Sequence, residues 1–255
     1  MIDLHNHILV NLDDGPKNEE EAIRLLKQAV EEGVTGIIAT PHHLNPMFNN
    51  EKQVVLEKIK ELKNLEEIKK LNIDIYPGQE IRLSDQILPQ LKEGKALSLN
   101  FSKYILIELP SNEVPHYTKN ILFELQSLGY VPVIAHPERN KVISQNLDVL
   151  YDLVNNGALS QLTSSSLNGD LGKKIQKNSI QMIENNLVHF IASDAHHYEN
   201  RPFIMNSLFK NKKLKNYKEE IEMLIKNSKL IIKNEDIKKY QPSKEYNNKK
   251  LFGIF

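Results

Sequence analysis

The alternation of short apolar runs with amphipathic stretches is the feature that most limits the fold of this 255-residue sequence. The apolar runs are rich in Ile, Val and Leu, and the longer stretches between them have helical apolar spacing. We expect strands at 1–5, 36–40, 73–76, 104–109, 131–135, 159–163 and 188–192, with helices at 18–32, 51–71, 116–128, 147–156 and 171–186. About seven strand–helix units in this order predict an α/β fold, a parallel barrel-like sheet ringed by helices.

We find no linker that would divide the chain, so we expect a single domain over residues 1–255. After about residue 211 the pattern weakens into a Lys-rich helix at 216–225 and a short apolar piece at 229–232. From about residue 237 we expect a polar, flexible tail that ends in an apolar run at 251–255. That run could dock on its own barrel, pair with another chain or be disordered.

The composition excludes several classes of protein. There are 33 basic and 33 acidic residues, so the chain lacks the basic surface of a nucleic-acid-binding protein. It has no cysteine, which excludes thiolate metal sites and a cysteine nucleophile. No stretch approaches the roughly 18 apolar residues of a membrane span, and the N-terminus has no basic targeting region. We therefore expect a cytoplasmic protein.

Imidazole and carboxylate side chains follow nearly every expected strand. Barrel enzymes carry their chemistry where the carboxyl ends of parallel strands meet, so we expect these side chains on one rim. The nine candidates are His5, His7, Asp14, His42, Glu80, Glu108, His136, Asp194 and His196. Five imidazoles with four carboxylates suit Mn, Fe, Zn or Mg, and nine ligands are enough for two or three ions that share a bridging carboxylate.

The spacing of these residues supports a metal site. His5 and His7 lie two residues apart on a strand, so both point to the same side, and Asp194 and His196 repeat the pattern. Glu108 interrupts an apolar strand, where a buried carboxylate needs a metal or a cationic partner. An isolated H-x-H motif is weak evidence, and the prediction depends on all the coincidences occurring together.

Other polar residues have less certain roles in the sequence. We expect His116, His189 and His197 to be ordinary residues outside the site. His43 could be a proton donor, could support His42 or could have no role.

Three arginines also follow strands. Arg139 lies three residues after His136, and Arg201 lies five after His196. Each guanidinium would donate two hydrogen bonds to phosphate oxygens, unless it forms a surface salt bridge. Arg82, just after Glu80, is a weaker candidate for the same role.

A series of motifs carries a family resemblance. In chain order these are L-H-N-H, D-D-G, A-T-P-H-H, P-G-Q-E-I-R, I-A-H-P-E-R and A-S-D-A-H. The chain resembles the PHP (polymerase and histidinol phosphatase) superfamily, and more closely the bacterial manganese-dependent protein-tyrosine phosphatases of capsule and exopolysaccharide gene clusters. The resemblance implies a distorted TIM-like (β/α)7 barrel with three divalent ions, most often Mn²⁺, and Fe, Mg or Zn as alternatives.

The resemblance also implies which residues hold which ion. His5, His7, Glu80 and Asp194 would bind the first, Glu80, Glu108 and His136 the second, and Asp14, His42 and His196 the third. Metal-activated hydroxide would attack phosphorus in line. The implied substrate is phosphotyrosine on the C-terminal tail of a bacterial tyrosine kinase.

Three alternatives stay open from the sequence. The same metals could serve a phosphatase of histidinol phosphate or another small molecule. A phosphodiesterase or nuclease is disfavoured by the neutral charge. A binding protein with an idle metal site is disfavoured because no expected ligand is missing.

Overall fold

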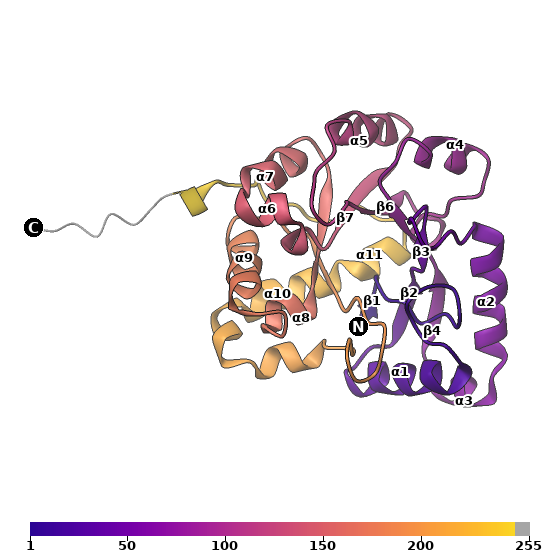
Figure 1. Cartoon of the computed structure of the whole chain (residues 1–255). Coiled ribbons are helices and arrows are strands. Elements are labelled where there is room, and N and C mark those ends of the chain that lie inside the picture. Colours follow the sequence, from indigo (N-terminus) through magenta and orange to yellow (C-terminus); the bar gives the residue numbers. More distant parts are fainter. Residues whose placement is uncertain (248–255) are drawn as a thin grey trace, which may run out of the picture.

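The computed structural model describes residues 1–247 and has parallel strands surrounded by helices (Figure 1). The strands are β1 (Ile2–Asp3), β2 (Gly36–Ala39), β3 (His42–His43), β4 (Asp74–Pro77), β5 (Glu80–Arg82), β6 (Tyr104–Glu108), β7 (Val131–Ala135), β8 (Leu159–Thr163) and β9 (Phe190–Ala192). They form two ladders in the orders β1-β2-β4 and β3-β5-β6-β7-β8-β9, and each described pair is parallel.

Two strand positions are broken, and this distorts the barrel. β2 is followed after Thr40 and Pro41 by β3, and β4 is followed after Gly78 and Gln79 by β5. Pro41 has no N–H to donate to a ladder. At Gly78 an added Cβ would lie 2.8 Å from Ile38 Cγ2, so the chain approaches its neighbour too closely for a side chain. Counting each broken strand once gives seven positions, as expected.

The first and last strand positions are joined beyond their carboxyl ends. Asn6 and Ala195 form a parallel bridge, and the Asp194 N–H donates to the His5 carbonyl over 2.8 Å. Asp3 reinforces this joint by accepting from Ser193 N at 2.7 Å and Ser193 Oγ at 2.8 Å. The predicted α/β class, parallel sheet and single domain are confirmed.

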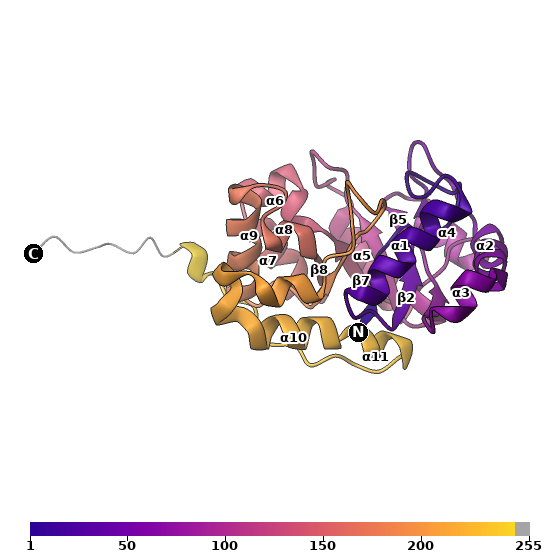
Figure 2. The ribbon, with the colours of Figure 1, turned by 90° about the horizontal axis from the view of Figure 1, so that it is seen from below.

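Helices cover the outside of the strands (Figures 1 and 2). They are α1 (Glu19–Glu31), α2 (Lys52–Asn64), α3 (Glu66–Lys70), α4 (Ile87–Lys92), α5 (Thr118–Ser127), α6 (Lys141–Gln145), α7 (Asp148–Asn155), α8 (Ser164–Asn168), α9 (Lys173–Glu184), α10 (Lys218–Lys226) and α11 (Ser228–Ile232). α1 begins where the Asn18 side chain accepts from Glu21 N at 2.9 Å. The long helix expected at 51–71 is two helices, because Leu65 has extended backbone angles.

The inside of the barrel changes from apolar to charged along each strand. In β6, Tyr104 and Leu106 belong to the inner apolar cluster, and Glu108 follows two residues later on the same face. α10 and α11 lie across the amino-terminal end of the barrel, where Ile231 packs on that inner cluster (Figure 2). The carboxyl end is therefore the polar, open end.

The segment expected to be a flexible tail contacts the barrel within the described residues. Ser243 N donates to the Asn185 carbonyl at 3.0 Å, and the Tyr246 hydroxyl donates to Asp148 Oδ1 at 2.8 Å. The apolar run at 251–255 lies outside the described residues. Among residues 1–247, no helix has both the length and the apolarity needed to cross a bilayer.

Candidate metal centre

The nine expected ligands gather in one cluster at the carboxyl ends of the strands. Three sets have ligand atoms within 4.8 Å of one another: His7, Asp14, His42 and His196; His5, His7 and Glu80; His42, Glu80 and Glu108. The other two join the same cluster. His136 Nε2 lies 2.7 Å from Glu80 Oε1, and Asp194 Oδ1 lies 3.4 Å from His5 Nε2.

Unusual backbone angles aim two of these side chains. His136 has φ +33° directly after β7, and Asp194 has φ +53° after β9. Residues other than glycine rarely adopt a positive φ. The backbone strain of such residues is concentrated at functional sites. In both turns the chain leaves the strand while the side chain stays over the barrel mouth.

Hydrogen bonds to Nδ1 fix how three histidines face the cluster. His7 Nδ1 lies 2.7 Å from Asp13 Oδ2, and His5 Nδ1 lies 2.8 Å from Gln161 Oε1. His196 Nδ1 lies 2.8 Å from the Asp194 carbonyl. Because each partner is an acceptor, Nδ1 carries a proton, and in the neutral ring Nε2 presents the lone pair to the cluster. These roles of Asp13 and Gln161 were not predicted from the sequence.

Several buried polar atoms in the cluster lack a hydrogen bond among the described residues, namely Glu80 Oε2, His42 Nδ1 and His196 Nε2. Glu80 Oε2 lies 2.9 Å from His42 Nδ1 and 3.4 Å from both His5 Nε2 and His7 Nε2. Buried polar atoms without partners are costly, and metal ions between such atoms remove that cost. The mixed N and O donors fit divalent ions of the Mn, Fe, Zn or Mg kind.

Burial and neighbouring charges favour the ligating form of three cluster residues, Glu80, His136 and His196. Burial opposes ionisation of Glu80, but His5 and His42 outweigh it and hold the pKa of Glu80 well below its usual range. Burial lowers the pKa of His136 to about 4, with a further contribution from Arg139. Burial likewise lowers the pKa of His196 to about 4. These two imidazoles are therefore neutral near pH 7 and free to ligate.

The two expected phosphate-binding arginines lie beside the cluster. Arg139 Nη2 and Arg201 Nη2 both donate to Asp194 Oδ2, the latter at 3.0 Å, and Arg201 Nη1 donates to Asp14 Oδ2 at 3.3 Å. Both arginines line a cavity of about 260 Å³ that also contains His42 and His136. A phosphate group in this cavity would meet the arginines and the expected metal ligands together.

Arg82 lies beside Glu108 and does not line the cavity of the other two arginines. Its Nε lies 3.2 Å from Glu108 Oε2, and its Nη1 donates to the Leu109 carbonyl at 3.1 Å. It is therefore the cationic partner expected for Glu108. Burial, together with the charge of Glu80, raises the pKa of Glu108 to about 7.

His43 is not brought into the site, which corrects its assignment as a candidate proton donor. It is buried, and its Nε2 lies 2.9 Å from Gln90 Oε1. Neighbouring residues of a strand point to opposite faces, so His42 turns inward and His43 turns outward toward α4.

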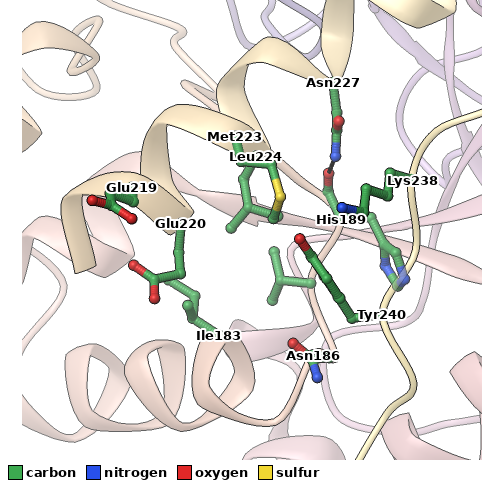
Figure 3. A pocket seen from close by; sticks show the side chains of 11 residues that line it. Ile183, Asn186, His189, Glu219, Glu220, Met223, Leu224, Asn227, Lys238 and Tyr240 are labelled. Carbon is green, nitrogen blue, oxygen red and sulfur yellow. Dashed lines mark hydrogen bonds between the residues drawn. The ribbon is translucent and has the colours of Figure 1, made fainter.

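His189 lies at the opposite end of β9 from Asp194, as expected of a residue outside the site. Its Nδ1 accepts from Ser160 N at 3.1 Å. It lines a separate cavity of about 430 Å³, in which Lys238 and Tyr240 of the C-terminal segment lie across from Glu220 (Figure 3). His116 and His197 also lie outside the metal-ligand groups.

Comparisons with known proteins agree with this geometry. A family model described as "Capsular polysaccharide synthesis, CpsB/CapC" matches residues 1–233. The chain is 56% identical over 254 residues to a Staphylococcus aureus protein named CapC, and 42% identical over 257 residues to the tyrosine-protein phosphatase YwqE of Bacillus subtilis. Both alignments cover 100% of each chain.

A solved structure is also similar. It belongs to a study of YwqE from Bacillus subtilis and CpsB from Streptococcus pneumoniae, described as unique metal-dependent tyrosine phosphatases. The match has a TM-score of 0.91 at 41% identity and covers 96% of this chain and 100% of the other.

Proposed function

Because the chain belongs to the CpsB/CapC family, we propose that it is a metal-dependent protein-tyrosine phosphatase of capsular polysaccharide synthesis. The observation that carries this proposal is the complete rim cluster, nine ligating side chains beside two arginines, in a fold so similar to known metal-dependent tyrosine phosphatases.

We propose three divalent ions, with Mn²⁺ as the working metal. His5, His7, Glu80 and Asp194 would hold one, Glu80, Glu108 and His136 the second, and Asp14, His42 and His196 the third. Two close sets support these assignments: His5–His7–Glu80 contains three of the four residues of the first ion, and His7–Asp14–His42–His196 contains all three of the third. When bound, such ions neutralise phosphoryl oxygens and activate water for attack on phosphorus.

The arginines position the phosphate in this proposal. Asp194 holds both guanidinium groups from one side, so their remaining N–H groups are oriented before the substrate arrives. Positioned cations of this kind stabilise the charge that spreads over the equatorial phosphoryl oxygens.

The leaving group explains why the site needs no strong acid. Tyrosine has a phenol pKa of about 10, far below that of an aliphatic alcohol, so its oxygen leaves as an anion more easily. This agrees with the outward orientation of His43. The partner in this proposal is a bacterial tyrosine kinase with a phosphorylated C-terminal tail, met in the cytoplasm, where kinases use ATP.

The experiment adds Mn, Mg, Fe or Zn separately to metal-stripped protein. The substrates are a phosphotyrosine peptide, histidinol phosphate and bis-p-nitrophenyl phosphate. We expect metal-dependent turnover that is fastest on the peptide. Faster turnover of histidinol phosphate or of the diester would overturn the substrate assignment, and no turnover with any ion would overturn the enzymatic function.

A further inference from the structure

A second cavity adjoins the proposed phosphate site. It has a volume of about 480 Å³, within the usual range for ligand sites, and shares Arg139, Asp194 and Arg201 with the smaller cavity of about 260 Å³. The two cavities therefore lie on either side of the arginine pair. Apart from Asp194, the larger cavity contains none of the nine expected metal ligands.

The walls of the larger cavity combine apolar and acidic side chains. Leu171 is 43% exposed although it is a large apolar residue, and Pro202 and Ile204 are half-buried beside it. Asp170 and Glu199 are exposed carboxylates on the same walls. An apolar surface with acidic groups at its edge suits a ligand with an aliphatic stem and a cationic end.

The charges in this cavity differ in how far they are already compensated. Arg139 and Arg201 are paired with Asp194, and Arg201 also with Asp14. Among residues 1–247, Asp170 accepts side-chain hydrogen bonds only from the neutral Asn168 amide, at 3.1 Å, and Glu199 forms no ion pair. The arginines face Asp194 and, in the proposed function, the phosphate, so Asp170 and Glu199 are the charges left to meet a neighbouring residue of the substrate.

We propose that this cavity is a subsite for the polypeptide next to phosphotyrosine, and that it accepts a Lys or Arg side chain of the substrate. This inference rests on the proposed function. An extended chain advances about 3.3–3.6 Å per residue. Only the residues nearest to the phosphotyrosine can therefore place a side chain in the cavity beyond Arg201. The stem of the basic side chain lies along Leu171 and Ile204, and its cationic end meets Asp170 and Glu199.

The test compares three substrates of different reach. Two phosphotyrosine peptides are identical except for Lys or Glu at the two positions on each side of the phosphotyrosine. The third substrate, p-nitrophenyl phosphate, is too small to reach the subsite. Exposed charge pairs contribute modestly, so we expect kcat/KM about fivefold higher for the Lys peptide, mainly through KM, and a smaller preference at high salt.

Variants of the exposed walls assign the preference to this cavity. Glu199→Gln should reduce the Lys preference to about twofold and leave p-nitrophenyl phosphate hydrolysis unchanged. Glu219→Gln, an exposed change at the other end of the barrel, is the matched control and should keep the preference.

Equal rates on the two peptides, or a preference that survives Glu199→Gln combined with Asp170→Asn, would overturn the subsite while the phosphatase function stands. Absence of turnover on all three substrates would overturn both.

Discussion

Asp13 accepts hydrogen bonds from two expected metal ligands, His7 and His42. Replacing it with Asn tests whether these bonds orient the His7 ring for metal binding. Its Oδ2 accepts from His7 Nδ1 at 2.7 Å and from His42 N at 3.0 Å, and its Oδ1 accepts from Gly15 N at 3.0 Å. In Asp13→Asn one oxygen remains, and when it serves Gly15 N an amide NH2 faces His7 Nδ1 and His42 N. His7 must then accept at Nδ1 and carry its proton on Nε2, which removes the lone pair that would bind metal.

The expected loss follows from these contacts. Changing the partner that orients a metal-binding histidine typically costs 10–100-fold in affinity or activity. Since His42 N also loses its acceptor, we expect the upper end, about 100-fold weaker Mn²⁺ binding or about 2.7 kcal/mol.

The assay is Mn²⁺ titration of metal-stripped protein by calorimetry, alongside phosphotyrosine hydrolysis over a range of Mn²⁺ concentrations. Activity should recover in part at high Mn²⁺. The exposed Asp85→Asn is the matched control and should bind Mn²⁺ like the parent. Parental Mn²⁺ affinity and stoichiometry in folded Asp13→Asn would refute the reasoning about the His7 tautomer.

Three further outcomes are expected. Arg139→Ala should lower kcat/KM on phosphotyrosine at least tenfold, because it removes a guanidinium from the phosphate site. Metal content, measured by elemental analysis, should stay unchanged. Unchanged kinetics would contradict the phosphate assignment. Burial lowers the pKa of His189 to about 3, so the unfolded chain, with a pKa near 6.5, binds the extra proton, and stability falls as pH drops from 6.5 toward 3. His189→Asn keeps an acceptor for Ser160 N. Between pH 7 and pH 4.5 its free energy of unfolding, measured with urea, should fall by about 2–3 kcal/mol less than that of the parent. An equal fall would count against burial of a neutral imidazole. Tyr104→Phe removes the 2.7 Å hydrogen bond to the Glu235 carbonyl and should lower Tm by about 2–4 °C in a thermal scan, whereas an unchanged Tm would show that this bond adds nothing to stability.

Much of the fold could be predicted from apolar periodicity, but the breaks in the strands could not. The expected strands at 131–135 and 159–163 coincide with β7 and β8, since each is a short run between turn or helix signals. At Pro41 the chain passes from the ladder that contains β2 to the ladder that contains β3. A short apolar run in the sequence does not reveal this break. The end of α2 at Leu65 was hidden because the apolar spacing continues into α3.

The candidate site could be predicted because the carboxyl ends of parallel strands meet in one place. The sequence placed His42 among the ligands but left the role of His43 open, because a two-residue strand after Pro41 does not show how an adjacent side chain is oriented. Gln161 contacts a residue 156 positions earlier, a pairing that no local pattern shows. Its only signal was a polar residue in an expected buried strand, the same signal that identified Glu108.

The joint between the first and last strands also sets when the protein becomes competent during its synthesis. Asp3 and Ser193 are 190 residues apart, and the His5 carbonyl meets Asp194 across a similar separation. At about 5–20 residues per second, a ribosome needs about 10–40 s to make the chain between them. During that time His5 and His7 lack the residues that complete their site. We therefore expect the nascent chain to be inactive and to take up metal only after Asp194 and His196 have been made.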